Sequence, residues 1–482
     1  MLFNSLDFAI FLPIVFLLYW FVVHRNLRLQ NAFIVIASYI FYGWWDWRFL
    51  LLIIFSTFVD YSVGYLLHRQ EKKRHRKLLL SISILVNLGF LAVFKYYNFF
   101  LENFVEAYSF FGGSIRPSSL SLILPVGISF YTFQTLSYTI DIYNRKLQPT
   151  KDFIAFSAFV CFFPQLVAGP IERATHLLPQ FLQKRSFEYN QAVNGLRQIL
   201  WGLFKKVVIA DNCARYADII FNSSEDASGS TLLVGAVFFA FQIYGDFSGY
   251  SDIAIGTSRL FGFDLMNNFN YPYFSRDIAE FWRRWHISLS TWFRDYLYIP
   301  LGGSLGSSWK KVRNIFIIFL VSGFWHGANW TFIAWGALNA LYFLPLMVTK
   351  RNRKFMGRIA VGKDLPSLHE FAQIALTFML TCFAWIFFRA RDLAHAFQYI
   401  GGIFDASLFQ FPTFHLDSEV RPLLLLLGAF MIMEWLGRDD AFAIENIGTP
   451  WPKPVRWSVY FGIVFLLFYF TGEQQQFIYF QF

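Results

Sequence analysis

The chain has 482 residues, of which 56% are hydrophobic and 15% are charged, and it contains 63 Phe, 24 Tyr and 16 Trp. Soluble globular proteins carry about 25% charged residues, so this composition excludes a soluble enzyme and indicates an integral membrane protein. The net charge of +10 does not indicate nucleic-acid binding, because the basic residues cluster in short loops between apolar runs, where they set membrane topology. Three scattered cysteines without CxxC spacing predict neither a disulfide framework nor a structural zinc site.

Long apolar runs recur along the whole chain, which a single cleaved signal peptide does not explain. We predict an all-α, polytopic membrane protein with one domain over residues 1–482 and about 11 to 13 transmembrane or re-entrant helices. The predicted spans are residues 8–23, 31–45, 49–67, 78–94, 120–143, 152–168, 196–210, 232–250, 314–345 (interrupted), 371–388, 423–436 and 456–472.

The charges in the loops predict the orientation. The loop at residues 68–77 carries six Lys or Arg side chains and one acid, so the positive-inside rule places it in the cytoplasm. Counting back through the spans puts the amino terminus outside. Lys205 and Lys206 are further candidates for the cytoplasmic side.

Two predicted spans are too polar for helices that face lipid. Residues 123–143 carry a Pro, a Gly and several hydroxyl and amide side chains, which membrane helices tolerate only against protein or in a water-filled cavity. Residues 241–256 add two carboxylates, Asp246 and Asp252. Either the acids cap backbone N–H groups at a loop or helix end, or they form a polar wall of a substrate passage.

The next polar segment, residues 272–300, is bracketed by prolines and combines aromatic residues with four arginines. This pattern predicts an amphipathic helix at the membrane interface that contacts lipid. Residues four apart share a helical face, so Glu280 should pair with Arg284. The same spacing places Trp282, His286 and Ser290 together on one helical face, with His286 in an aromatic stripe.

A second histidine in apolar surroundings, His326, lies within the sequence GFWHGANW at residues 323–330. Gly323 and Gly327 are expected to break the long helix and allow close backbone approach, and Asn329 offers a partner for the imidazole. A histidine between helices is often only a packing residue, but an ionisable group at this depth is costly unless it is used. Two histidines without a nearby cysteine or acid cluster make a poor metal site, and we expect none.

Six stretches of sequence carry a resemblance to a known family. They are LPVGISFYTFQTLSYTIDIY, FFPQLVAGPIER, YGDFSGYSDIAIG, NFNYPYFSRDIAEFW, FWRRWHISLSTWFRDYLYIPLGG and SGFWHGANWTFIAWGALNA. In this order they resemble the membrane-bound O-acyltransferase family, in its bacterial branch that modifies cell-envelope polymers. The resemblance covers most of residues 1–390. It implies a ring of helices around a central tunnel.

The resemblance also implies roles for individual residues. His326 matches the family's catalytic histidine and His286 its upstream companion. A neutral imidazole accepts a proton from an attacking hydroxyl, and burial disfavours the charged form. Trp325, Asn329 and Asp295, together with the two carboxylates of residues 241–256, are candidates for orienting groups or tunnel walls. Arg283 and Arg284 are candidates for binding an anionic acyl donor at the inner face, although lipid headgroups would suit them equally.

The family's bacterial members pass an acyl group from a cytoplasmic donor, here expected to be acetyl-CoA, to an extracytoplasmic acceptor. No loop is long enough to fold as a soluble transferase domain, so a separate extracytoplasmic acetyltransferase partner is expected. The polymer stays open between alginate, peptidoglycan and other polysaccharides, and no bound cofactor is expected. The expected location is the bacterial inner membrane.

Two alternatives remain. One is a teichoic-acid D-alanylation enzyme that takes its acyl group from an acyl carrier protein. The other is a polymer or lipid transporter without chemistry, which polar spans and intramembrane acids also fit. Many transporters contain two related halves, and this chain shows no internal repeat.

Overall fold

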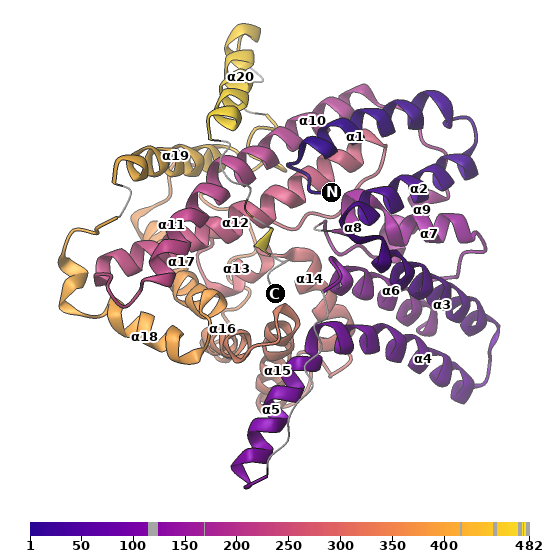
Figure 1. The fold of residues 1–482 in the computed structure, drawn as a ribbon, viewed down its shortest axis with the longest axis horizontal. Helices are drawn as coiled ribbons and strands as arrows, with labels where there is room; N and C mark the ends of the chain where they lie inside the picture. The colour runs from indigo at the N-terminus through magenta and orange to yellow at the C-terminus, as the bar shows by residue number, and fades with distance from the viewer. Residues whose placement is uncertain are drawn as a thin grey trace. The chain divides into compact units, whose positions relative to one another are not determined.

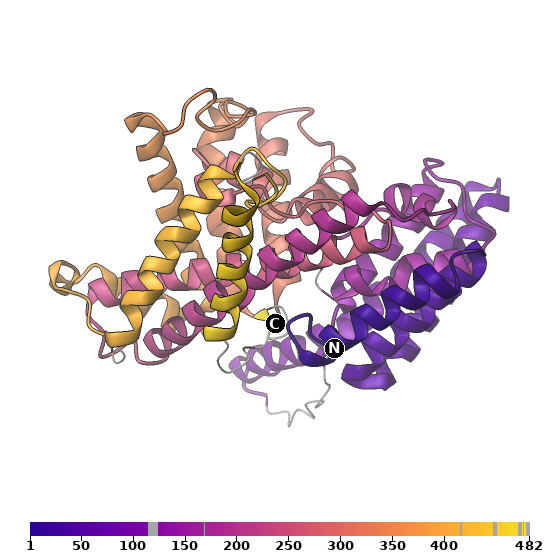
Figure 2. The ribbon, with the colours of Figure 1, turned by 90° about the horizontal axis from the view of Figure 1, so that it is seen from above.

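The computed structural model describes residues 1–113, 124–167, 169–414, 417–446, 451–470, 475, 477 and 478. Every regular element in these residues is a helix, as the composition predicts (Figures 1 and 2). Internal contacts divide the chain into two compact units, residues 1–196 with 254–266 (unit 1) and residues 197–253 with 267–482 (unit 2). The single domain expected from the sequence stays a prediction.

Unit 1 contains the amino-terminal helices. They are α1 (Leu6–Leu17), η1 (Leu18–Val22), α2 (Leu27–Asp46), η2 (Trp47–Phe49), α3 (Leu50–Arg69), α4 (Lys73–Leu91), η3 (Ala92–Tyr96), α5 (Tyr97–Phe110), α6 (Ile128–Tyr143), α7 (Phe153–Cys161), α8 (Phe163–Leu166), α9 (Ala174–Phe181) and most of α10 (Tyr189–Leu203).

Unit 2 contains the remaining elements. They are η4 (Phe204–Ala210), α11 (Asp211–Asn222), most of α12 (Gly229–Leu260), η5 (Pro272–Phe274), α13 (Ile278–Arg284), α14 (Ile287–Phe293), η6 (Arg294–Tyr298), α15 (Ser308–His326), α16 (Trp330–Val348), α17 (Leu368–Arg389), α18 (Leu393–Ile403), η7 (Ala406–Phe409), α19 (Asp417–Leu436) and α20 (Lys453–Tyr469).

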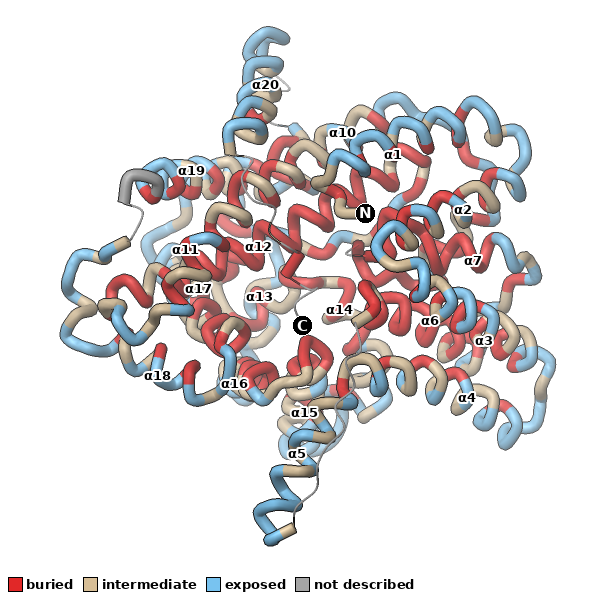
Figure 3. The backbone as a smooth tube through the Cα atoms, in the orientation of Figure 1, coloured by how far each residue is buried: buried red, intermediate tan, exposed pale blue. Residues whose placement is uncertain are grey.

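The helices confirm a multi-pass membrane protein. Among the described residues, five continuous helical stretches are long and apolar enough to cross a membrane: 27–69, 73–110, 229–260, 330–348 and 368–389. This number is smaller than the count predicted from apolar runs, because residues 27–69 hold two of the predicted spans and because other runs, such as residues 6–22 and 153–166, form shorter helices. Figure 3 shows α12 buried over most of its length, whereas α5 and α20 are largely exposed. Exposed apolar side chains on such helices suit a lipid environment.

The polar span expected to face protein does so within unit 1. Nearly every side chain of α6 is buried, and its hydroxyls meet a polar cluster around Asp60 of α3. Asn87 donates to the Asp60 carboxylate at 2.9 Å and Thr135 of α6 donates to the amide oxygen of Asn87 at 3.1 Å. Asp60, Asn87 and Thr135 are thereby hydrogen-bonded to one another away from lipid. The interior placement predicted for this span is confirmed over residues 128–143, and residues 120–123 lie outside the described part.

The motif FFPQLVAGPIER ends in a clasp within unit 1. Glu172 is fully buried, and its carboxylate contacts Nδ1 of His176 at 2.7 Å and accepts the backbone N–H of Met266 at 2.6 Å. Nε2 of His176 lies 3.7 Å from the carboxylate of Asp264. The clasp joins the start of α9 to the segment that follows α12. Hydrogen bonds with Asp264 and Glu172 raise the pKa of His176 to about 10.

The His176 clasp predicts a stability that depends on alkaline pH. Because the folded-state pKa of about 10 exceeds the ordinary value of 6.5, the stabilisation is fully present below pH 6.5 and is lost as pH rises through 10. We expect His176→Gln to unfold at a lower temperature than the wild type at pH 6.5, with the gap closing near pH 10.5. Thermal unfolding of both purified proteins in detergent measures the gap. A difference in unfolding temperature that does not change with pH would contradict a stabilising charge on His176.

Candidate functional site

His326 is the last residue of helix α15, at the junction with α16. Gly327 follows it with an extended backbone, and Asn329 caps α16 by accepting the N–H of Thr331 at 3.0 Å. The helix therefore ends at Gly327, as the sequence predicts. The break expected at Gly323 is wrong, because this glycine lies inside α15.

Glycines set the spacing between α15 and α16, which pack along their lengths. A Cβ on Gly323 would lie 2.2 Å from the carbonyl oxygen of Phe332, and one on Gly336 would lie 2.3 Å from that of Phe319. Real Cβ atoms do not approach so closely, so only glycine permits this contact between the helices. The close packing of α15 against α16 therefore fixes the position of His326 at the end of α15.

His286 lies at a break between two short helices. The single interfacial helix predicted for residues 272–300 is wrong, because the segment divides into η5, α13, α14 and η6. His286 itself has φ 43° and ψ 55°, a left-handed conformation that is unfavourable for a side chain with a Cβ. The predicted stripe of Trp282 and His286 on one helical face is therefore wrong. The predicted pair of Glu280 and Arg284 is confirmed, at 3.0 Å.

The structure brings the two histidines to a common tryptophan. The ring of His286 lies 6.1 Å from the indole of Trp325, which in turn lies 4.9 Å from the ring of His326. His326 also contacts Trp335 at 5.2 Å. His286 is 1% and His326 is 4% exposed. His286 lies outside the membrane-spanning stretches, and its burial lowers its pKa to about 3, which keeps it neutral at pH 7.

Two proposed orienting residues have other partners. The amide of Asn329, besides capping α16, donates to the carbonyl of Arg391 at 2.9 Å. Asp295 accepts Nε of its neighbour Arg294 at 2.7 Å. Trp325 is the sequence candidate that the structure places against both histidines. Among the described residues, no group of three His, Cys, Asp or Glu side chains is arranged to hold a metal ion.

Asp246 and Asp252 lie inside the long helix α12 rather than at a loop or helix end. Asp252 pairs with Lys205 at 2.5 Å, and Asp246 pairs with Lys206 at 2.8 Å. Both lysines come from the π-helical segment η4 and are buried, at 4% and 1% exposed. Both lysines therefore lie in a buried helical segment, and their place on the cytoplasmic side stays a prediction. Two buried cations opposite two buried acids in apolar surroundings form ion pairs that sequence reasoning missed.

The Asp252 pair belongs to a larger buried network. Gln198 donates to Asp252 at 2.9 Å, and Lys205 lies near the ring of Tyr244. The hydroxyl of Tyr244 donates in turn to Glu434 at 2.5 Å. The network links α10, η4, α12 and α19 within unit 2. Such connected polar groups fix the packing of helices whose other contacts are apolar.

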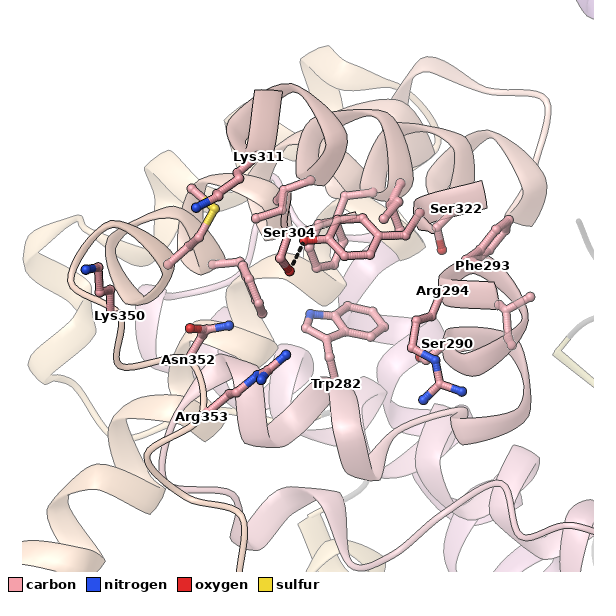
Figure 4. Close-up of a pocket in the computed structure, with 17 residues that line it drawn as sticks. Trp282, Ser290, Phe293, Arg294, Ser304, Lys311, Ser322, Lys350, Asn352 and Arg353 are labelled. Carbon is pink, nitrogen blue, oxygen red and sulfur yellow. Dashed lines mark hydrogen bonds between the residues drawn. The ribbon is translucent and has the colours of Figure 1, made fainter. Parts of the chain in front are cut away.

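A cavity of about 480 Å³ opens beside the end of α15 that carries His326. Its walls are mostly apolar, and its polar ends carry hydroxyls and cations without an acid (Figure 4). The lining residues are Trp282, Leu289, Ser290, Phe293, Arg294, Tyr298, Ser304, Lys311, Ile315, Ile318, Phe319, Ser322, Phe343, Met347, Lys350, Asn352 and Arg353.

The two ends of the cavity differ. Figure 4 shows Lys311, Lys350 and Arg353 at one end, and Ser322 with the single cation Arg294 at the other. Ser322 precedes His326 by one helical turn, so both project from one face of α15. The indole N–H of Trp282 is buried in the cavity wall with no hydrogen-bond partner among the described residues. The cavity thus connects a cationic end with the neighbourhood of the histidine.

Arg283 and Arg284 do not line this cavity. Arg283 donates to the carbonyls of Asn352 at 2.9 Å and Phe355 at 2.7 Å. Arg284 pairs with Glu280 and lines a second cavity, of about 390 Å³, together with Arg358, Arg438, Asp439 and Asp440. Arg283 therefore holds the loop that supplies Asn352 and Arg353 to the first cavity. The cavity cations could not be found from the sequence, because Arg294, Lys311 and the neighbouring Lys350 and Arg353 come from three separate segments.

Comparison with known proteins matches residues 15–358 to the model of MBOAT, the membrane-bound O-acyltransferase family. A protein of Pseudomonas aeruginosa called "Probable alginate O-acetylase AlgI" is 39% identical over 94% of this chain and 84% of its own length. The "Peptidoglycan O-acetyltransferase" of Helicobacter pylori is 34% identical over 100% of this chain and 98% of its own. A "Teichoic acid D-alanyltransferase" of Streptococcus thermophilus is 29% identical over 56% of this chain and 69% of its own.

Proposed function

Because the chain belongs to the membrane-bound O-acyltransferase family, we propose that it transfers an acetyl group from a cytoplasmic donor towards a cell-envelope polysaccharide. The family and the relatives establish an acyltransferase and a multi-pass membrane protein. The observation that carries the finer proposal is the cationic cavity that reaches Ser322, one helical turn before His326, together with the contact of Trp325 with both histidines.

His326 is the proposed general base. It takes the proton from an acceptor hydroxyl as the oxygen attacks the thioester carbonyl, the carbon–sulfur bond breaks, and the thiolate leaves and takes up a proton. A base works best when its pKa lies near the working pH, and burial lowers the pKa of His286 to about 3, well below that pH. His286 is assigned a supporting role across the indole of Trp325.

The cavity suits acetyl-CoA, the proposed donor. Phosphate groups would bind among Lys311, Lys350 and Arg353, because these side chains offer several N–H donors without a competing acid. The pantetheine arm would follow the apolar walls, where the free indole N–H of Trp282 offers a hydrogen bond to an amide carbonyl. The thioester would then reach the turn between Ser322 and His326. Arg283 supports this site by holding its loop.

The donor site predicts a change in donor affinity. We expect the triple variant Lys311→Gln, Lys350→Gln and Arg353→Gln to need at least roughly tenfold more acetyl-CoA for half-maximal transfer, since charge-assisted hydrogen bonds contribute about 1.5–3 kcal/mol each. The maximal rate should change little, because these groups lie away from the reacting carbonyl. Transfer of labelled acetyl groups in membrane vesicles of known orientation, supplied with acetyl-CoA on one side, measures both quantities.

A matched triple variant provides the control. Lys72→Gln, Lys73→Gln and Arg74→Gln remove three exposed cations outside the cavity, so they alter net charge equally. This control should leave the donor requirement unchanged. Equal weakening by both triples would assign the effect to general attraction of an anion, and no weakening by the cavity triple would reject the site.

The acceptor is proposed to lie across the membrane, reached through a separate acetyltransferase protein. The support is the similarity, over most of the chain, to relatives named for alginate and peptidoglycan O-acetylation. The proposed location is the bacterial inner membrane.

The similarity to teichoic-acid D-alanyltransferases keeps an acyl carrier protein as the alternative donor. Vesicles that transfer an acyl group from acetylated carrier protein but not from acetyl-CoA would favour that alternative. The second alternative, a transporter without chemistry, is disfavoured because the chain belongs to an acyltransferase family.

A further inference from the structure

Three residues that follow α20, Gln475, Phe477 and Ile478, lie inside unit 2. Phe477 is 0% exposed and Ile478 is 1% exposed. Neither belongs to a membrane-spanning helix, so their burial has to come from specific contacts with the rest of the unit. Through a series of aromatic ring contacts, Phe477 is connected to His286.

The ion pair of Lys206 and Asp246 holds these residues by their backbone. The N–H of Ile478 donates to the Asp246 carboxylate at 2.7 Å, and Nζ of Lys206 donates to the carbonyl of Gln475 at 3.1 Å. Lys206 also pairs with Asp211 at 2.7 Å. Charged groups make stronger hydrogen bonds than neutral ones, so the pair clamps the segment on both sides of Phe477.

The clamp places the Phe477 ring in an aromatic series that ends at His286. Phe477 lies 4.4 Å from the ring of Tyr250 and 6.2 Å from that of Phe247. Phe247 meets His286 edge to face at 4.7 Å. Phe247 also contacts Phe269 at 5.0 Å. The ring against His286 is therefore in contact with both Phe269 and Phe477.

We infer that Phe477 is a positioning residue for His286, acting through Phe247, and that the clamp of Lys206 and Asp246 exists to place it. The inference rests on the proposed function for its catalytic consequence. His286 has a strained left-handed backbone, and such a conformation persists only where surrounding packing enforces it. Removal of the Phe477 ring leaves a cavity into which Phe247 relaxes, and this relaxation frees the imidazole.

The first measurement is chemical labelling, which requires no enzymatic activity. Diethyl pyrocarbonate acylates accessible neutral imidazoles, and peptide mass spectrometry of the purified full chain in detergent reports the rate at His286. We expect Phe477→Ala to raise this rate at least several-fold over the wild type. Phe477→Leu keeps apolar bulk and should give an intermediate rate, and it carries the test if the alanine variant does not fold.

The second measurement is acetyl transfer. Phe477→Ala should lower kcat by roughly tenfold to a hundredfold, the scale expected when a catalytic group is misplaced by about 1 Å. The KM for the donor should stay unchanged, because Phe477, Tyr250 and Phe247 do not line the donor cavity. Phe477→Leu should recover part of kcat. If Phe477→Ala only impaired folding, the amount of active protein would fall, and Phe477→Leu would not recover kcat per folded molecule.

A buried phenylalanine elsewhere in unit 2 provides the control. Phe221 of α11 is 1% exposed and stacks on Tyr399 at 4.2 Å. Phe221→Ala should lower the unfolding temperature comparably without changing the His286 labelling rate. Equal labelling in the wild type and Phe477→Ala, or equal acceleration by Phe221→Ala, overturns the inference. Faster labelling with an unchanged kcat also overturns the positioning role. If the wild type transfers no acyl group, the proposed function fails. The rate of His286 labelling then tests by itself whether Phe477 positions His286.

Discussion

Replacement of His326 by Ala or Gln is expected to abolish acyl transfer while the protein still inserts and folds. A general base contributes roughly 10²- to 10⁴-fold to rate, so the loss should reach at least the lower figure. Gln keeps most of the side-chain volume at the end of α15, which separates the loss of the base from a packing defect. Labelled acetyl transfer in vesicles, normalised to folded protein, measures the effect.

His395 provides the matched control for this prediction. It is a buried histidine of the same unit, at the start of α18, where its ring contacts Ser224 at 3.2 Å. His395→Gln should retain transfer, because the ring serves packing and capping contacts away from the cavity. Full transfer by His326→Gln would refute the proposed base, and equal loss in both variants would assign the effect to folding.

Replacement of Lys205 by Met is expected to destabilise unit 2 strongly. The variant leaves the Asp252 carboxylate buried without its cation, and breaking a buried ion pair costs about 3–5 kcal/mol. The double variant Lys205→Met and Asp252→Asn removes the uncompensated charge, and Asn keeps an oxygen for Gln198. It should therefore recover most of the lost stability. Thermal unfolding in detergent and accumulation in membranes measure both variants.

The Lys205 experiment also separates the two interpretations of the acidic residues in α12. A structural pair predicts coupled stability effects and a double variant that still transfers acyl groups. A polar wall of a substrate passage predicts that Lys205→Met folds normally and that every change at Asp252 impairs transfer. The observed 2.5 Å pairing of the two buried side chains favours the structural interpretation.

Local sequence patterns predicted the helical spans well where one physical cause dominated. Apolar runs located α2, α3, α12, α16 and α17, because burial in lipid requires long uninterrupted helices. The same reasoning failed at residues 272–300. Helical spacing predicted one amphipathic helix, whereas tertiary packing imposed a left-handed backbone at His286 and divided the segment.

The sequence by itself determined the membrane environment, the helical class and the family, and it singled out two histidines whose catalytic role stays a prediction. These follow from composition, hydrophobic periodicity and motifs, which are properties of single segments. Only the tertiary structure decided which distant groups meet. It paired Lys205 and Lys206 with carboxylates of α12, gathered the cavity cations, and brought Phe477 to the aromatic series at His286. Such contacts depend on how helices pack side by side, and no local pattern encodes the partner of a buried charge or ring.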